Sequence, residues 1–313
     1  MIQFAVRRLF TTLPTLFIVT VLVFALVHLL PGDPARIMLG EGATPESVIA
    51  LREKLGFDRS LPEQYLRWLA DIARLDFGNS LRNLPVTTLI AEKLPITLEL
   101  AVLSTLLSMV IAVPVGLFSA LKPGGLLDRT LTLLALCGIS LPTFFAGIIL
   151  IYIFSVRLAW IPAGGYVSFF ENPARNLTLM ILPSVTLGAF SAAVLSRYMR
   201  SSMLEAMSQD YIRTAAAKGA RTFTVVVKHG LRNALVPVVT ALGLQLGTLL
   251  GGAVVTEQIF SVPGFGNLLV YSVYNRDFLV IQGLVLVIAL AVFLVSFLVD
   301  LAYAAIDPRI RYQ

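Results

Sequence analysis

The chain has 313 residues, of which 57% are hydrophobic and 13% are charged, and its formal net charge is +6. Its mean hydropathy is +0.86. Apolar content this high, spread over long runs, excludes an ordinary soluble domain and indicates a polytopic membrane protein. Because the cations never gather into one soluble face, the basic balance indicates membrane orientation and not nucleic-acid binding.

Six apolar runs are long enough to cross the hydrocarbon as helices, which takes about 20 residues each. They cover residues 9–30, 97–121, 130–155, 178–200, 236–259 and 280–304. Membrane-spanning strands would show short alternating segments instead. The first run lacks a small-residue cleavage site and is too long for a signal peptide, so we expect it to be retained. The sequence predicts an all-α polytopic membrane protein with six transmembrane helices.

Lysine and arginine in the short flanks of the runs set the predicted orientation, because cytosolic flanks carry the excess of cations. One set of flanks holds Arg7, Arg8, Lys122, Arg129, Arg309 and Arg311. The opposite short loops hold only Arg157, Arg175 and Arg276. Both termini are therefore predicted to be cytosolic.

Residues 31–96 form the sizeable segment on the predicted outer side. Thr44 to Glu46 have the pattern of an N-cap, a first-turn proline and an early acid, and Gly56 is placed to end that helix. Ser60 and Glu63 have capping-box spacing ahead of a second helical period. We expect a small helical extracytoplasmic insertion, either a plain amphipathic lid or a segment that contacts a ligand.

The fifth apolar run carries small residues every fourth position, which predicts a close helix-packing face formed by Gly243, Gly247 and Gly251. Beside it runs a stripe of polar or small residues: Gln245, Thr248, Gly252 and Thr256. Polar groups in hydrocarbon need partners or water. The stripe therefore either lines a candidate translocation path or forms hydrogen bonds between helices.

The sequence offers no catalytic or metal-binding constellation. Two histidines and one cysteine, far apart, give no metal site, and no nucleophile–base pair is visible. The glycine-rich loop at 261–266 lacks the Lys-Ser/Thr of a P-loop. Glu99, Glu257 and Asp300 are expected near span ends, within reach of solvent or headgroups. The chain is predicted to be no enzyme, with no catalytic, metal or cofactor site of its own.

Residues 197–236 form a basic segment between two apolar runs and are predicted to be a cytosolic loop. Asp210 is expected to cap a short helix that ends near Lys218, with Gly219 as the C′ residue. A helix this short is not stable alone in water, so we expect it to dock on another surface. The alternative is an ordinary membrane-surface loop with basic anchors.

Two stretches of this segment have a recognisable pattern. From Asp210 the chain reads D-Y-I-R-T-A-A-A-K-G, and from His229 it reads H-G-L-R-N-A-L-V-P-V-V-T. They resemble the cytoplasmic signature loop of ABC importer permeases of the dipeptide, oligopeptide, nickel and glutathione group. The wider superfamily expects Glu-Ala-Ala where this chain has Arg213-Thr214-Ala215. Other stretches resemble the first permease of such systems: Arg7–Leu9, Pro31–Pro34, Asp76–Gly78, Phe260–Gly266 and Asp307–Arg311.

The resemblance implies a type I ABC importer permease fold, with 1–313 as one multi-pass permease domain of the bacterial inner membrane. It implies a second related permease, two ABC ATPase subunits that bind the ATP and Mg, and an extracytoplasmic substrate-binding protein as partners. Residues 210–219 would be the coupling helix that the ATPase receives. Its coupling residues would be Asp210, Tyr211, Arg213, Thr214, Ala215, Lys218 and Gly219.

Import of short peptides is the expected function, with glutathione or nickel as alternative cargo in the same architecture. A secondary transporter driven by an ion gradient is the contrasting class. It predicts inverted repeats and acids at mid-membrane, and the sequence has neither. A membrane scaffold without a path of its own is a further alternative.

Overall fold

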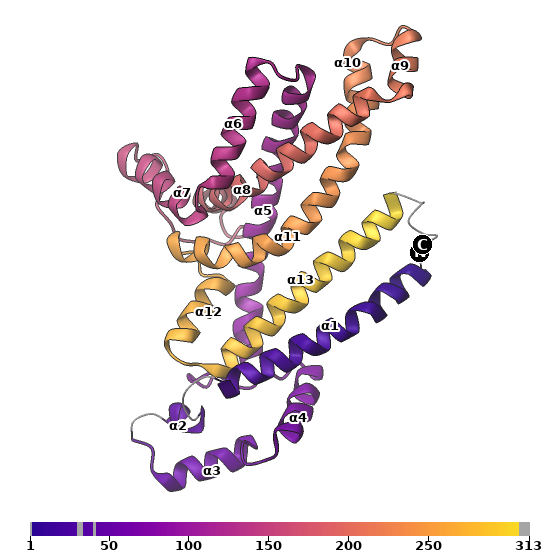
Figure 1. Ribbon diagram of the computed structural model, residues 1–313. Helices are drawn as coiled ribbons and strands as arrows, with labels where there is room; N and C mark the ends of the chain where they lie inside the picture. Colours follow the sequence, from indigo (N-terminus) through magenta and orange to yellow (C-terminus); the bar gives the residue numbers. More distant parts are fainter. Residues whose placement is uncertain (1, 30–33, 40–41, 307–313) are drawn as a thin grey trace. The chain divides into compact units, whose positions relative to one another are not determined.

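A computed structural model describes residues 2–29, 34–39 and 42–306 (Figure 1). These residues are mostly helical and contain no strand apart from one isolated bridge between Asn79 and Pro85. The predicted all-α class is therefore confirmed. The motif residues 31–33 and 307–311 lie outside the described residues, and so do the cations Arg309 and Arg311.

The chain divides into two compact units. Unit 1 consists mainly of Thr97–Pro263 and Val295–Gln313, and unit 2 of Ile2–Ile96 and Gly264–Leu294. The long helices α5 (Val86–Leu121) and α13 (Phe278–Ile306) contribute residues to both units. The division between the two units therefore falls within continuous helices, and the single permease domain expected from the sequence stays a prediction.

Besides its parts of α5 and α13, unit 2 contains α1 (Ile2–Leu29), α2 (Pro34–Leu39), α3 (Pro45–Leu55), α4 (Leu61–Ala73) and α12 (Phe265–Tyr274). The Thr44 hydroxyl accepts the N–H of Ser47 at 3.3 Å, and Gly56 ends α3 with a φ of 73°. Both features of α3 are as predicted, because side-chain caps and left-handed glycines act locally. Ser60, however, makes no side-chain cap at α4.

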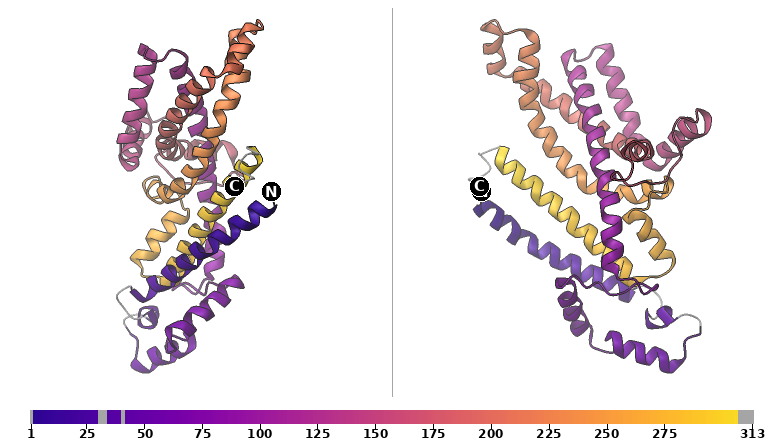
Figure 2. Two further views of the ribbon diagram at one scale, coloured as in Figure 1. Left: turned by 45° about the vertical axis from the view of Figure 1, so that its right-hand side comes forward. Right: turned by 180° about the vertical axis from the view of Figure 1, so that it is seen from behind.

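Besides its parts of α5 and α13, unit 1 contains six α-helices and two π-helical segments among the described residues. The α-helices are α6 (Leu126–Ser140), α7 (Thr143–Leu150), α8 (Pro173–Ser208), α9 (Asp210–Ala217), α10 (Thr222–Thr224) and α11 (Arg232–Ile259). The π-helical segments are η1 (Ile151–Arg157) and η2 (Val225–Leu231). Helices α8 and α11 pack along each other. Their shared core includes Leu195, Met199 and Met203 of α8 and Val238 of α11, all fully buried. Figure 2 shows α9 and α10 at one end of this pair.

Four described helices are long and apolar enough to span a membrane: Val86–Leu121, Pro173–Ser208, Thr222–Leu249 and Phe278–Val299. A fifth candidate combines Leu126–Ser140 with Thr143–Arg157, but that pair is bent by 104°. The run predicted over 130–155 is therefore a broken helix, with Pro142 at the break. Helix α1 contributes a shorter apolar stretch, Phe10–Ala25, within the region described.

Close helix approach occurs at isolated glycines of unit 1. A Cβ placed on Gly188 of α8 would lie 2.7 Å from the backbone oxygen of Ser104 on α5. Of the predicted glycine face, Gly243 packs against Val299, whereas a Cβ on Gly251 would meet no described atom within 4 Å. Within the described residues, the predicted face thus has a close neighbour at Gly243 and none at Gly251, and its role in helix packing stays a prediction. Gly247 is half-buried.

Candidate functional site

Helix α9 follows α8 after a single residue. The N-cap is Gln209, with extended φ and ψ angles of −74° and 150°, so the predicted cap at Asp210 is wrong by one position. Asp210 instead occupies the first turn, where its carboxylate suits the positive end of the helix dipole. The chain leaves α9 through Lys218 and then Gly219, whose φ is 80°. Glycine adopts this left-handed conformation without the steric cost that a Cβ brings.

One face of α9 holds the helix against unit 1. Ile212 is 5% exposed, and α9 contacts both η2 and the end of α8. The Asn233 side-chain amide of α11 donates to the Tyr211 hydroxyl at 3.2 Å and to the His229 carbonyl at 2.8 Å. These contacts supply the docking surface that so short a helix needs to stay folded.

The opposite face of α9 is open. Arg213, Thr214, Lys218 and Gly219 are all exposed, and Ala215 is half-buried. Arg213 lies 3.5 Å from the Asp210 carboxylate, but both side chains are largely solvated, so this pair adds little stability. The face therefore presents cations and small side chains to the solvent.

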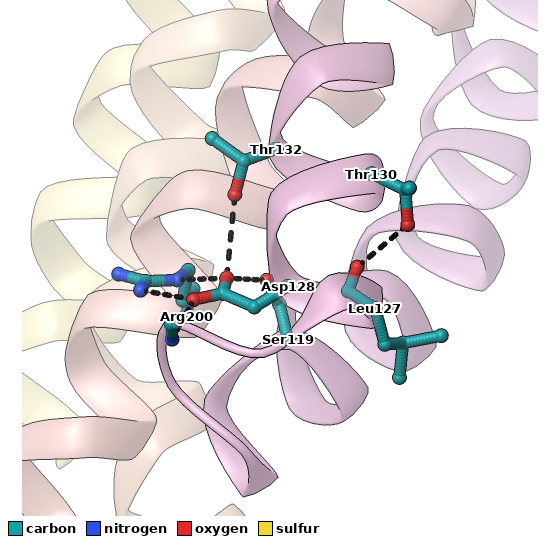
Figure 3. A network of polar contacts seen from close by, with 7 residues as sticks. Ser119, Leu127, Asp128, Thr130, Thr132 and Arg200 are labelled. Carbon is teal, nitrogen blue, oxygen red and sulfur yellow. Dashed lines mark hydrogen bonds and ion pairs between the residues drawn. The ribbon is translucent and has the colours of Figure 1, made fainter.

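A buried ion pair secures α8 ahead of α9 (Figure 3). Asp128 of α6 is 4% exposed, and Arg200 of α8 donates to its two oxygens from Nε and Nη2, each at 2.7 Å. The carboxylate also accepts the Ser119 hydroxyl, the Gly124 N–H at 2.8 Å and the Thr132 hydroxyl at 3.3 Å. Five donors around one carboxylate satisfy a charge that would otherwise be costly to bury.

No sequence pattern predicts this network. Its two charged members are separated by 72 positions, and no periodic pattern links them. The one signal in the sequence is Asp128 itself, an acid in the first turn of an apolar helix. Its favourable interaction with the helix dipole is enough to explain an acid at this position, so the signal does not point to Arg200.

The polar stripe of α11 divides into two parts. Thr248 is exposed, and its hydroxyl lies 2.7 Å from the backbone carbonyl of Gln245 and 3.0 Å from the side-chain carbonyl. Gly252 instead faces Leu187 of α8, and Thr256 is 1% exposed and donates to the Gly252 carbonyl at 3.3 Å. The second half thus packs inside the bundle, whereas Thr248 in the first half stays exposed.

Two acids of unit 1 are less accessible than expected. Glu257 is fully buried and accepts the Thr97 hydroxyl at 2.6 Å, so the expectation that solvent reaches it is wrong. Glu99 accepts the Tyr166 hydroxyl at 2.9 Å. Burial, together with this bond to Glu99, raises the pKa of Tyr166 to about 12. The loop that carries Tyr166 is also held by the Gly165 N–H, which donates to the Phe260 carbonyl at 2.9 Å.

Unit 2 has a polar anchor of its own at the start of α13. The Asp277 carboxylate accepts the Leu81 N–H at 2.9 Å and lies 3.5 Å from the Val280 nitrogen. Its burial outweighs these bonds and raises the pKa of the Asp277 carboxyl. The contact holds the turn before α5 against α13.

The apolar helices and the exposed helix between α8 and α11 define a membrane transport subunit. The fold is similar to a chain of the MetNI methionine ABC transporter solved in inward-facing conformations, with a TM-score of 0.59 at 22% identity, covering 70% of this chain and 96% of that one. The chain belongs to the family described as binding-protein-dependent transport system inner membrane component, whose model matches residues 112–312. The N-terminal model of the same systems matches residues 1–101.

Relatives match along the full length. The glutathione transport system permease protein GsiC of Pectobacterium atrosepticum is 46% identical over 314 residues and covers all of both chains. GsiC of Escherichia coli K12 is 43% identical with the same coverage. The probable peptide ABC transporter permease protein y4tP of Sinorhizobium fredii is 42% identical over 310 residues, 99% of each chain. The chain is thus an ABC importer permease and a multi-pass component of the inner membrane.

Proposed function

We propose that α9, with Lys218 and Gly219, is the coupling helix through which ATPase subunits drive this permease. The observation that carries the proposal is the two-sided arrangement of α9. Its inner face is held by Ile212 and by the Asn233–Tyr211 hydrogen bond, while Arg213 and Lys218 stay exposed. A partner that moves this helix also moves the packed end of α8, which is how a rigid-body transition is transmitted.

The partners are proposed from the family. A second related permease completes the path, two ABC ATPases bind ATP and Mg and hydrolyse the nucleotide, and an extracytoplasmic binding protein delivers the cargo. In this arrangement the segment 31–96 contributes to the surface that receives the binding protein. Half-buried Gln245 and exposed Thr248, which are joined by a hydrogen bond, contribute to the path.

Short peptides are the proposed cargo. One relative is named for peptide transport and others for glutathione, which is itself a modified tripeptide. The dipeptide, oligopeptide and glutathione assignments therefore share one chemistry, a small molecule with a peptide backbone. Nickel remains the alternative cargo, but neither of these relatives is named for nickel transport.

Charge reversal on α9 tests the coupling role. Arg213→Glu and Lys218→Glu, assembled with the partner subunits in proteoliposomes, are expected to lose peptide uptake while the complex still inserts and the ATPases still hydrolyse ATP. The matched control is Arg175→Glu, an exposed arginine outside the 197–236 segment. Wild-type uptake in both α9 variants would overturn the proposal. Uptake that resists vanadate but collapses with a protonophore would instead indicate a secondary transporter.

A further inference from the structure

A pocket of about 490 Å³ lies beside the Asp128–Arg200 pair, between α6 and α8. Its lining combines cations, hydroxyls and leucines: Asp128, Arg129, Thr132, Leu133, Leu136, Arg197, Arg200 and Ser201. Three arginines and one aspartate give the lining an excess of positive charge. Neither the coupling role of α9 nor the candidate path uses these residues.

The arginines of the pocket are differently engaged. Arg200 binds Asp128 through Nε and Nη2, and no bond from its Nη1 to a described residue is found. Arg129 and Arg197 are exposed, and within the described part of the chain neither guanidinium has an ion-pair partner. Since Asp128 neutralises only one of the three cations, the pocket is complementary to an anion.

The apolar part of the lining restricts the kind of anion. Leu133 and Leu136 are 62% and 45% exposed, and they belong to an apolar helix that is a candidate membrane segment. Arg129 precedes them on the same helix, in a flank that the distribution of cations predicts to be cytosolic. A ligand that meets both features has a phosphate at the arginines and hydrocarbon along the leucines.

We propose that this pocket binds the phosphodiester headgroup of an anionic phospholipid of the cytosolic leaflet, with an acyl chain lying along Leu133 and Leu136. Basic pockets between membrane helices on the cytosolic side are suited to such headgroups. Arg129, Arg197 and the free Nη1 of Arg200 contact the phosphate, and the Ser201 hydroxyl offers a further donor. The two hydrogen bonds to Asp128 hold the Arg200 guanidinium in place at the pocket wall.

Native mass spectrometry of the full-length chain, delipidated and titrated with phosphatidylglycerol, tests the site. The variant Arg129→Gln/Arg197→Gln leaves the Asp128–Arg200 pair intact and is expected to bind about 25-fold more weakly, because each arginine near a lipid surface contributes about one factor of five. The control Arg175→Gln/Arg276→Gln removes the same charge from exposed positions outside the pocket and should bind as wild type. Arg129→Lys/Arg197→Lys should retain most of the affinity.

Each remaining outcome is decisive. Equal binding of phosphatidylcholine with matched acyl chains would overturn the proposal, because the headgroup charge would then be irrelevant. Displacement of the lipid by inorganic phosphate at low millimolar concentration would also overturn it, since the site would then recognise phosphate without the hydrocarbon. A double glutamine variant that elutes as wild type on size exclusion and binds phosphatidylglycerol with unchanged affinity would do the same.

Discussion

Arg200 and Asp128 join α8 to α6 through two parallel hydrogen bonds of 2.7 Å, with the carboxylate buried and the arginine side chain 31% exposed. Arg200 belongs to the last part of α8, which leads into α9, the proposed coupling helix. The first prediction concerns its contribution to stability. Arg200→Gln leaves a buried carboxylate without its counter-charge, so the melting temperature of the purified chain should fall by roughly 5 °C or more.

The control for this variant is Arg213→Gln, which removes an exposed ion pair at 3.5 Å from Asp210. Its melting temperature should be unchanged, because solvated pairs contribute little. Arg200→Lys keeps the charge but loses the two-point geometry, and we expect an intermediate melting temperature. Equal melting temperatures for Arg200→Gln and wild type would contradict the structural role of the pair.

Anchoring of α9 gives the second prediction. Ile212→Ser removes the buried side chain that holds this helix and should speed amide hydrogen exchange across 210–217, because the helix is too short to persist undocked. Peptide uptake by the assembled transporter should fall in this variant, while amide exchange in the buried core of α8 should stay slow. The exposed neighbour Thr214→Ser is the control and should leave exchange unchanged.

Helix approach at Gly188 gives the third prediction. Gly188→Ala places a methyl group 2.7 Å from the Ser104 carbonyl, so α8 and α5 must separate locally, at a cost of about 1–3 kcal/mol. Gly251→Ala is the matched substitution, because a Cβ there meets no described atom within 4 Å. Thermal unfolding of both variants in one detergent should show a loss only for Gly188→Ala.

Titration of Asp277 gives the fourth prediction. Because burial raises its pKa in the folded state, the folded protein binds this proton more tightly than the unfolded chain. The resulting stabilisation is present below the ordinary carboxyl pKa of about 4 and is lost as the pH rises through the folded value. Asp277→Asn should remove this part of the pH dependence. The measurement is the difference in melting temperature between wild type and this variant, followed as the pH rises from below the ordinary carboxyl pKa, and a difference that does not vary with pH would contradict the prediction.

Local signals in the sequence were sufficient for several elements. Thr44 and Gly56 delimit α3 because a cap and a left-handed glycine act within one turn. Gly219 follows α9 for the same reason. The one-residue error at Asp210 shows the limit of such signals, since Gln209 and Asp210 are neighbours at the helix start and only the backbone angles show that Gln209 is the cap and Asp210 the first helical residue.

The sequence by itself determined the all-helical membrane class, the importer-permease motif at 210–219 and the start and end of α3, because hydropathy and capping are properties of neighbouring residues. Only the tertiary structure decided which polar groups meet. It paired Asp128 with Arg200 and Thr97 with Glu257, placed Thr256 inside the bundle, and left Gly251 open. These relationships depend on how distant helices rotate and pack against each other, and helical periodicity alone does not specify which face of one helix meets which face of the next.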